Sequence, residues 1–287
     1  MTIKSILCIF NGSQDELNAL NTAYVLGKTY GAEIRVLHIS PDPASFASTY
    51  SEGIILNSPF IKSIEKENTE HMHKAKQYVS SFAVKHNLPF DKKEIPMHHA
   101  SIRFQHLIGM GDFIVAHEGR LSDLIVIGHK SASLYDLLSP ALFDTGRPVF
   151  ILPAEPHNLT NEFKDKIVAF AWNGSLQAAR AIYNALPLLH RVEKFYIIKV
   201  EKRNSELSDE TNLMSYLKTH GISTESILIP AGKYQNTGEA IATKTKELNA
   251  DLLIMGAYGH SVFREMILGG VTQYMLKNIQ LPILLSH

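Results

Sequence analysis

Short apolar runs alternate with longer amphipathic segments along the whole chain. In the second half, five apolar runs of strand length are separated by segments of helical periodicity, among them residues 176–189 and 237–248. The predicted strands of this half are 167–171, 195–200, 226–229, 252–255 and 282–285. Buried strands that alternate with helices are typical of a parallel sheet covered on both faces, so the pattern predicts the α/β class.

The first half repeats this alternation with one long interruption. A helix is expected from about residue 65 to residue 86, and residues 40–64 before it have loop composition. A lid, an interface and a disordered segment all fit that composition. The predicted strands of this half are 3–10, 34–39, 93–96, 124–127 and 149–152.

Two pairs of matching stretches show that the halves are copies of one unit. IKSILCIFNGS near the start returns as DKIVAFAWNGS at Asp165, and each stretch is followed by an amphipathic helix and a second strand. LSDLIVIG in the first half likewise matches NADLLIMG in the second. We therefore predict two tandem α/β domains, residues 1–155 and 160–287, joined by a polar stretch.

Composition and charge exclude several classes of partner. Lys plus Arg and Asp plus Glu each number 28, so the chain has no net field for nucleic acid or anionic membrane, and its partner is small or is protein. Cys8 is the only cysteine, which excludes an internal disulfide and fits a reducing compartment. No apolar run approaches the about 20 residues that span a bilayer, and we expect a cytoplasmic protein.

Metal and hydrolase chemistry find no support in the sequence. The 14 histidines form no Cys/His array with ligand spacing, so we expect no metal site and interpret them as polar surface. A Gly-x-Ser-x-Gly nucleophile motif is absent from the sequence, so a hydrolase is not predicted either.

A glycine-rich segment near the C-terminus carries the clearest functional signal. In ADLLIMGAYGHSVFREMILGGVTQYML, an apolar strand is followed by glycines, and a helical pattern begins near Val271. Glycines after a strand let the backbone approach a ligand, and the N–H groups of the next helix favour an anion. A tight turn with close packing of helix on sheet remains the alternative. The residues of this segment assigned to ligand binding are Gly256, Gly259, Gly269, Gly270, Val271 and Thr272.

GAYG, nine intervening positions and GGVT resemble the phosphate-binding signature of the universal stress protein family. The resemblance implies Rossmann-like, doubly wound domains, each with a five-stranded parallel sheet of order 3-2-1-4-5, paired as an intramolecular pseudo-dimer; a further homodimer stays open. It also implies a nucleotide ligand, ATP or AMP, at the carboxyl ends of the first and fourth strands, which Mg²⁺ could accompany. Gly270 stands where the family usually has Ser or Thr.

The same resemblance assigns two residues to the base. Asn173, like Asn11 in the first half, matches a family Asp that contacts adenine, and Val200 matches a position whose backbone faces the base. A neutral Asn can still recognise a base edge, because it both donates and accepts hydrogen bonds. The alternative is that each Asn-Gly-Ser only makes a strand-to-helix turn, with Ser13 or Ser175 capping the helix that follows.

The resemblance therefore suggests a stress-response regulator or interaction module that binds ATP or AMP in its second domain. The first domain keeps Gly128 but lacks the later glycines, and we interpret it as degenerate for nucleotide binding. Two alternatives remain: an interaction protein that has lost nucleotide binding, and a slow ATPase. No carboxylate of the motif is placed as a general base, so we do not expect an enzyme.

Overall fold

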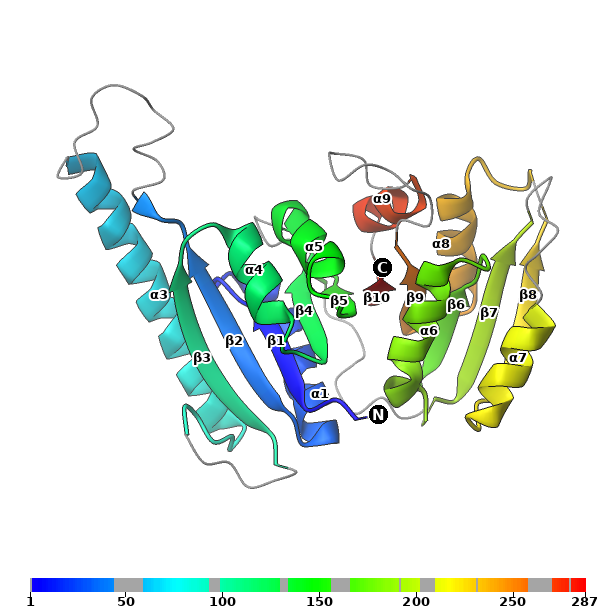
Figure 1. Cartoon of the computed structure of the whole chain (residues 1–287), viewed down its shortest axis with the longest axis horizontal. Coiled ribbons are helices and arrows are strands. Elements are labelled where there is room, and N and C mark those ends of the chain that lie inside the picture. Colours follow the sequence, from blue (N-terminus) through cyan, green and yellow to red (C-terminus); the bar gives the residue numbers. More distant parts are fainter. Residues whose placement is uncertain are drawn as a thin grey trace. The chain divides into compact units, whose positions relative to one another are not determined.

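The computed structural model describes residues 2–43, 59–92, 99–129, 134–155, 166–190, 192–201, 210–230, 232–257, 270–278 and 280–287. It shows an α/β protein that divides into two compact units (Figure 1). The first unit is Ile3–Arg147, and the second is Pro148–His287 together with the first two residues. No helix among these residues is both long and apolar enough to cross a membrane.

The first unit contains four parallel strands in the order β3-β2-β1-β4. The predicted third strand, 93–96, lies outside the described residues, and the strand found between β2 and β4 in the sequence is β3. The elements are β1 (Ser5–Ile9), the 3-10 turn η1 (Gln14–Glu16), α1 (Leu17–Tyr30), β2 (Glu33–Ser40), α3 (Pro59–Lys85), β3 (Ser101–Ile108), α4 (Gly111–Gly119), β4 (Leu124–Gly128) and α5 (Leu134–Phe143).

The second unit contains a sheet of order β5-β10-β9-β6-β7-β8. Five of its strands are parallel and follow the order 3-2-1-4-5 within the repeat, which confirms the doubly wound topology. Its elements are β5 (Val149–Leu152), β6 (Ile167–Ala171), α6 (Leu176–Leu189), β7 (Lys194–Val200), α7 (Glu210–Thr219), β8 (Glu225–Ile229), α8 (Thr237–Glu247), β9 (Leu252–Gly256), α9 (Gly270–Lys277) and β10 (Ile283–Ser286).

Strand β5 departs from the expected all-parallel arrangement. It pairs antiparallel with β10, with Phe150 opposite Leu284 at the centre and Val149 opposite Leu285. RPVFILP and LPILLSH occupy the same place in the two repeats, so this pairing has an internal pseudo-two-fold relation about Phe150 and Leu284. The second unit, from Pro148 on, thus contains β5 in addition to the five parallel strands of its repeat.

The helices of the second unit cover its sheet on two faces. Right-handed crossovers in this strand order place α6 and α7 on one face, here called the α6 face, and α8 and α9 on the other, the α9 face. The close packing of α8 on α9 agrees, because a Cβ added to Gly238 would lie 2.6 Å from Cβ of Tyr274. The strands between these layers form the core: most side chains of β6, β9 and β10 are buried.

The two units share local geometry as well as sequence. A carboxylate holds the amino end of the first strand in each: Oδ2 of Asp123 accepts from Ser5 N at 3.0 Å, and Oδ2 of Asp251 accepts from Ile167 N at 2.9 Å. These equivalent bonds fix the register between the copies. Asn11 at the end of β1 therefore corresponds to Asn173 at the end of β6.

Candidate functional site

The candidate site lies at the carboxyl ends of β6, β7 and β9. Strand β6 pairs with β7 on one side and β9 on the other, with Ala171 opposite both Ile198 and Met255. The residues that follow these partners are brought to one edge of the sheet, at the point where the strand order reverses. The structure thus places Asn173, Val200 and Gly256 together, as the topology of the resemblance implied.

Alternation along the strands tells which face each side chain occupies. Lys199 Nζ donates to Oε2 of Glu210 in α7 at 2.7 Å, so Lys199 lies on the α6 face. Successive side chains of a strand point to opposite faces, which places Val200 on the α9 face. Val200 is half-buried there, at the last position of β7.

Gly256 has a structural reason to be glycine. A Cβ at this position would lie 2.5 Å from Ala178 N and 2.7 Å from the carbonyl carbon of Gln177, both in the first turn of α6. No side chain fits such a distance to backbone atoms. Close packing of helix on sheet therefore accounts for Gly256, which is the alternative that the sequence left open for this residue.

The side chain of Asn173 makes the turn between β6 and α6. Its Oδ1 accepts from Ser175 N at 3.1 Å and from Ser175 Oγ at 2.7 Å, while Ser175 Oγ accepts from Ala178 N at 3.2 Å as the N-cap. The alternative that Asn173 only makes a turn therefore holds for its Oδ1 atom. Asn173 is exposed, and its Nδ2 donates no hydrogen bond to any described residue, so a donor remains at the edge.

The glycine motif is only partly within the described residues. Gly259 and Gly269 lie outside them. Gly270 begins α9 and is exposed, and a Cβ added to it would meet nothing within 4 Å. Val271 is half-buried, and Thr272 is buried with 3% of its surface exposed, so the Thr272 side chain belongs to the packed side of α9.

The N-termini of α8 and α9 flank a cavity of about 490 Å³ on the α9 face. Side chains already bond the backbone at the N-terminus of α8. Glu239 Oε2 accepts from Gln235 N at 2.8 Å, and Asn236 Oδ1 accepts from Glu239 N at 2.9 Å. Helix α9 has no acidic residue in its first turn. Its N–H groups and positive dipole end therefore make it the better place for an external anion.

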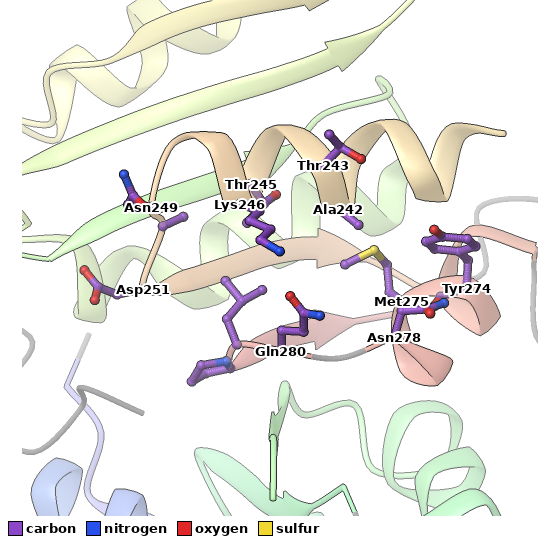
Figure 2. Close-up of a pocket in the computed structure, with 13 residues that line it drawn as sticks. Ala242, Thr243, Thr245, Lys246, Asn249, Asp251, Tyr274, Met275, Asn278 and Gln280 are labelled. Carbon is purple, nitrogen blue, oxygen red and sulfur yellow. The ribbon is translucent and has the colours of Figure 1, made fainter. Parts of the chain in front are cut away.

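A second cavity, of about 520 Å³, lies away from this edge. Figure 2 shows it between α8 and α9, with Lys246, Asn249 and Gln280 around it and Asp251 at the start of β9. These residues belong to the amino-terminal end of the sheet, and Asp251 is already bonded to Ile167 N. The cavity therefore lies mainly at the amino ends of β9 and β10, although it shares Tyr274 and Asn278 with the first cavity.

The sequence analysis interpreted the histidines as polar surface, but His38 and His106 are not exposed. His38 in β2 is 3% exposed, and its Nδ1 lies 3.3 Å from the Phe10 carbonyl oxygen. His106 in β3 places Nε2 3.0 Å from Ser40 Oγ. Burial lowers the pKa of both imidazoles below the ordinary histidine value. Within the described residues, His, Cys, Asp and Glu form no group of three able to hold a metal ion.

The equivalent edge of the first unit is occupied by its own carboxylate. Glu16, 1% exposed, accepts from Asn11 N at 2.7 Å and from Ser13 N at 3.3 Å through Oε2. Asn11 Oδ1 is buried and has no hydrogen-bond partner in the structure as described. The sequence analysis missed Glu16, although Ser13 and Glu16 have the spacing of a capping box.

Comparison with known proteins agrees with this architecture. Residues 199–287 match the model described as "Universal stress protein family". A curated universal stress protein from Synechocystis sp. is 26% identical over 180 residues, which are 61% of this chain and 58% of that protein. The chain thus matches less than two thirds of that relative's length.

Two solved structures share the fold across almost the whole chain. A universal stress protein from Archaeoglobus fulgidus DSM 4304 has a TM-score of 0.68 at 18% identity, covering 98% of this chain and 96% of that one. A protein of unknown function from Pseudomonas aeruginosa PAO1 has a TM-score of 0.58 at 12% identity, covering 99% and 92%. Residues 199–287 of the second unit are thus similar to the universal stress protein family, and the fold is shared with such a protein over almost the whole chain.

Proposed function

We propose that the second unit binds an adenine nucleotide, ATP or AMP, and that the chain acts as a tandem stress-response regulator or interaction module. The observation that carries the proposal is that β6, β7 and β9 end at one edge of the sheet, from which the chain continues to the N-terminus of α9. That helix begins at Gly270 without an acidic residue in its first turn, directly after the segment that holds the glycine motif.

The residues of this edge divide between the two ends of the ligand. Asn173 Nδ2 and the backbone at Val200 would face the base, because both lie where β6 and β7 end. The first N–H groups of α9, from Gly270 and Val271, would hold phosphate, and Mg²⁺ could accompany a triphosphate. Gly256 contributes by letting α6 approach β9 rather than by touching the ligand.

Binding without multiple turnover fits two described carboxylates near this edge, which are already engaged. Glu210 is paired with Lys199, and Glu239 Oε2 accepts from Gln235 N just before α8. A general base must reach the attacking water with a carboxylate that is not already committed to another partner. We therefore propose a nucleotide-binding module and not an ATPase.

The test is whether the base contact is specific to the second unit. Asn173→Ala should weaken ATP and AMP alike by about fivefold, the value of one ordinary hydrogen bond, because both ligands share adenine. Asn11→Ala is the matched control, since it alters the same Asn-Gly-Ser motif in the first unit, and it should leave both affinities unchanged. Equal effects of the two substitutions would refute the assignment.

The second candidate is an interaction protein that has lost its ligand. The observations in its favour are Gly270, which supplies no hydroxyl, and the burial of Thr272. Mass spectrometry of small molecules released by denaturing the purified protein separates the two candidates. Adenine nucleotide in near-stoichiometric amount supports binding, whereas its absence, with no heat of binding on adding ATP, favours the interaction protein.

A further inference from the structure

The end of β10 lies beside the start of the segment that leads to α9. Strand β10 runs parallel to β9 with Ser286 opposite Gly256, so His287 comes level with Ala257, one residue beyond β9. Asn184 of α6 donates from Nδ2 to Ser286 Oγ at 3.2 Å, which places Ser286 on the α6 face. By alternation, His287 lies on the α9 face, the same face as Val200.

Both backbone polar groups of Ala257 are held by the end of β10. Ala257 N donates to the Ser286 carbonyl at 2.8 Å, and His287 Nδ1 lies 3.1 Å from the Ala257 carbonyl oxygen. A carbonyl oxygen can only accept, so Nδ1 of His287 carries the proton in this contact. The His287 side chain thus adds a hydrogen bond to the backbone bond between Ser286 of β10 and Ala257.

Ala257 is held on its other side as well. The preceding Gly256 is packed against the first turn of α6, where a Cβ would lie 2.5 Å from Ala178 N. Ala257 itself is fully buried. The backbone therefore leaves β9 in a direction fixed by α6 on one face and by His287 on the other.

We propose that His287 is a positioning residue of the nucleotide site: by donating from Nδ1 to the Ala257 carbonyl, it fixes the backbone at the exit of β9. This inference rests on the proposed function of the same edge. A ligand held mainly by backbone groups depends on their placement, because a small displacement lengthens several hydrogen bonds together.

The first repeat provides an internal comparison. Pro153 occupies the position of His287 when RPVFILP is matched with LPILLSH. Proline has no side-chain donor, so the backbone after β4 cannot be held in this way from that position. The donor therefore belongs to the repeat that carries the glycine motif, and it is missing from the repeat that lacks it.

Two substitutions of similar size test the proposal in the full chain. His287→Asn keeps an N–H donor near the position of Nδ1, and His287→Leu removes it. Calorimetric titration with ATP should show affinity within about twofold of wild type for Asn, and about fivefold weaker binding for Leu, the effect of one lost hydrogen bond. Thermal melts of both variants should remain cooperative.

The outcomes separate this inference from the function on which it rests. If wild type binds ATP and His287→Leu binds it equally well, the positioning role is wrong and the nucleotide site stands. If His287→Asn binds ATP as weakly as His287→Leu, the N–H donor is not what positions the backbone, which also overturns the positioning role. If wild type binds no ATP, the proposed function fails and the inference fails with it.

Discussion

The ends of β1 and β6 carry the same Asn-Gly-Ser motif but different chemistry. After β1, Glu16 enters the turn and its carboxylate accepts from the backbone of Asn11 and Ser13. After β6, the position of Glu16 is taken by Ala178, and the neutral side chains of Asn173 and Ser175 complete the turn.

The two turns show that a repeated motif does not determine the charge of the group that completes the turn. The turn forms in both units, because an oxygen acceptor is available to the turn N–H groups in each. In the first unit that acceptor is a buried negative charge, which repels a phosphate placed nearby. In the second unit it is neutral, and we therefore expect this edge to accept an external anion. We predict that one carboxylate, three residues beyond a shared Ser, closes the first edge to an anion, whereas the second edge is open to one.

The largest effect should come from adding a methyl group where α6 meets β9. Gly256→Ala places Cβ against backbone atoms of Gln177 and Ala178, which cannot move without shifting the helix. We expect destabilisation of about 2–3 kcal/mol, typical of overpacking. Gly270→Ala is the control, since its Cβ meets nothing within 4 Å and should change stability by less than about 0.5 kcal/mol. Urea unfolding measures both, and similar values would show that Gly256 does not limit this packing.

The next effect concerns the carboxylate that closes the first edge. Glu16→Ala leaves Asn11 N and Ser13 N without their acceptor in a buried site. Loss of these charge-assisted bonds should cost about 2 kcal/mol of unfolding free energy.

The reverse exchange at the matching position, Ala178→Glu, should weaken ATP binding in the second unit. Unchanged affinity in Ala178→Glu, with the fold intact, would break the comparison between the two edges.

Acid should act on the first unit through His38. Its pKa is lowered first by burial; the contact with the Phe10 carbonyl opposes this, and the nearby His106 and His71 lower the pKa further. The folded pKa is thus below the unfolded value of about 6.5, so the stability from neutral His38 is present above that value and is lost as the pH falls through it. The matching residue of the second unit is Lys199, paired with Glu210.

Thermal melts at about pH 7.5 and pH 5.5 test this assignment. Wild type should melt at a lower temperature in acid, and His38→Gln should reduce the difference between the two pH values. His73→Gln, at an exposed position of α3, is the control and should leave the difference unchanged. An undiminished difference in His38→Gln would assign the acid sensitivity to other groups.

The smallest predicted effect is a gain in affinity. Gly270→Ser supplies the hydroxyl that the family usually has at this place, and the structure leaves room for it. We expect ATP to bind about 1 kcal/mol more tightly, the net value of one hydrogen bond. Weaker binding by a variant that melts like wild type would mean that α9 needs glycine at its first position.

Local patterns predicted most of the fold, since each signal was confined to one element. Residues 176–189 were predicted as a helix, and α6 has those bounds because Ser175 caps it and an apolar stripe continues to Leu189. Strand β3 was missed, because it is half-exposed and carries Arg103, Gln105 and His106 among its apolar residues. The antiparallel pairing of β5 with β10 joins distant parts of the sequence, so periodicity could not reveal it.

The site was predicted less completely, because its details depend on contacts across elements. The strand order implied by the family resemblance brought Asn173, Val200 and Gly256 to one edge, but the packing of Gly256 on Ala178 appears only when α6 lies on β9. The burial of Glu16 and the contact of His287 with Ala257 depend in the same way on tertiary structure and strand register. Of these features, only the capping box of Ser13 and Glu16 could have been recognised from the sequence.

The most direct measurement of the central claim is the stoichiometry of ATP binding to the full chain by calorimetry. An open edge in the second unit and a closed edge in the first predict a value near one, and predict that Ala178→Glu weakens ATP binding. A value near two would show that Glu16 does not close the first edge. Binding that persists undiminished in Ala178→Glu would place the nucleotide away from the end of β6.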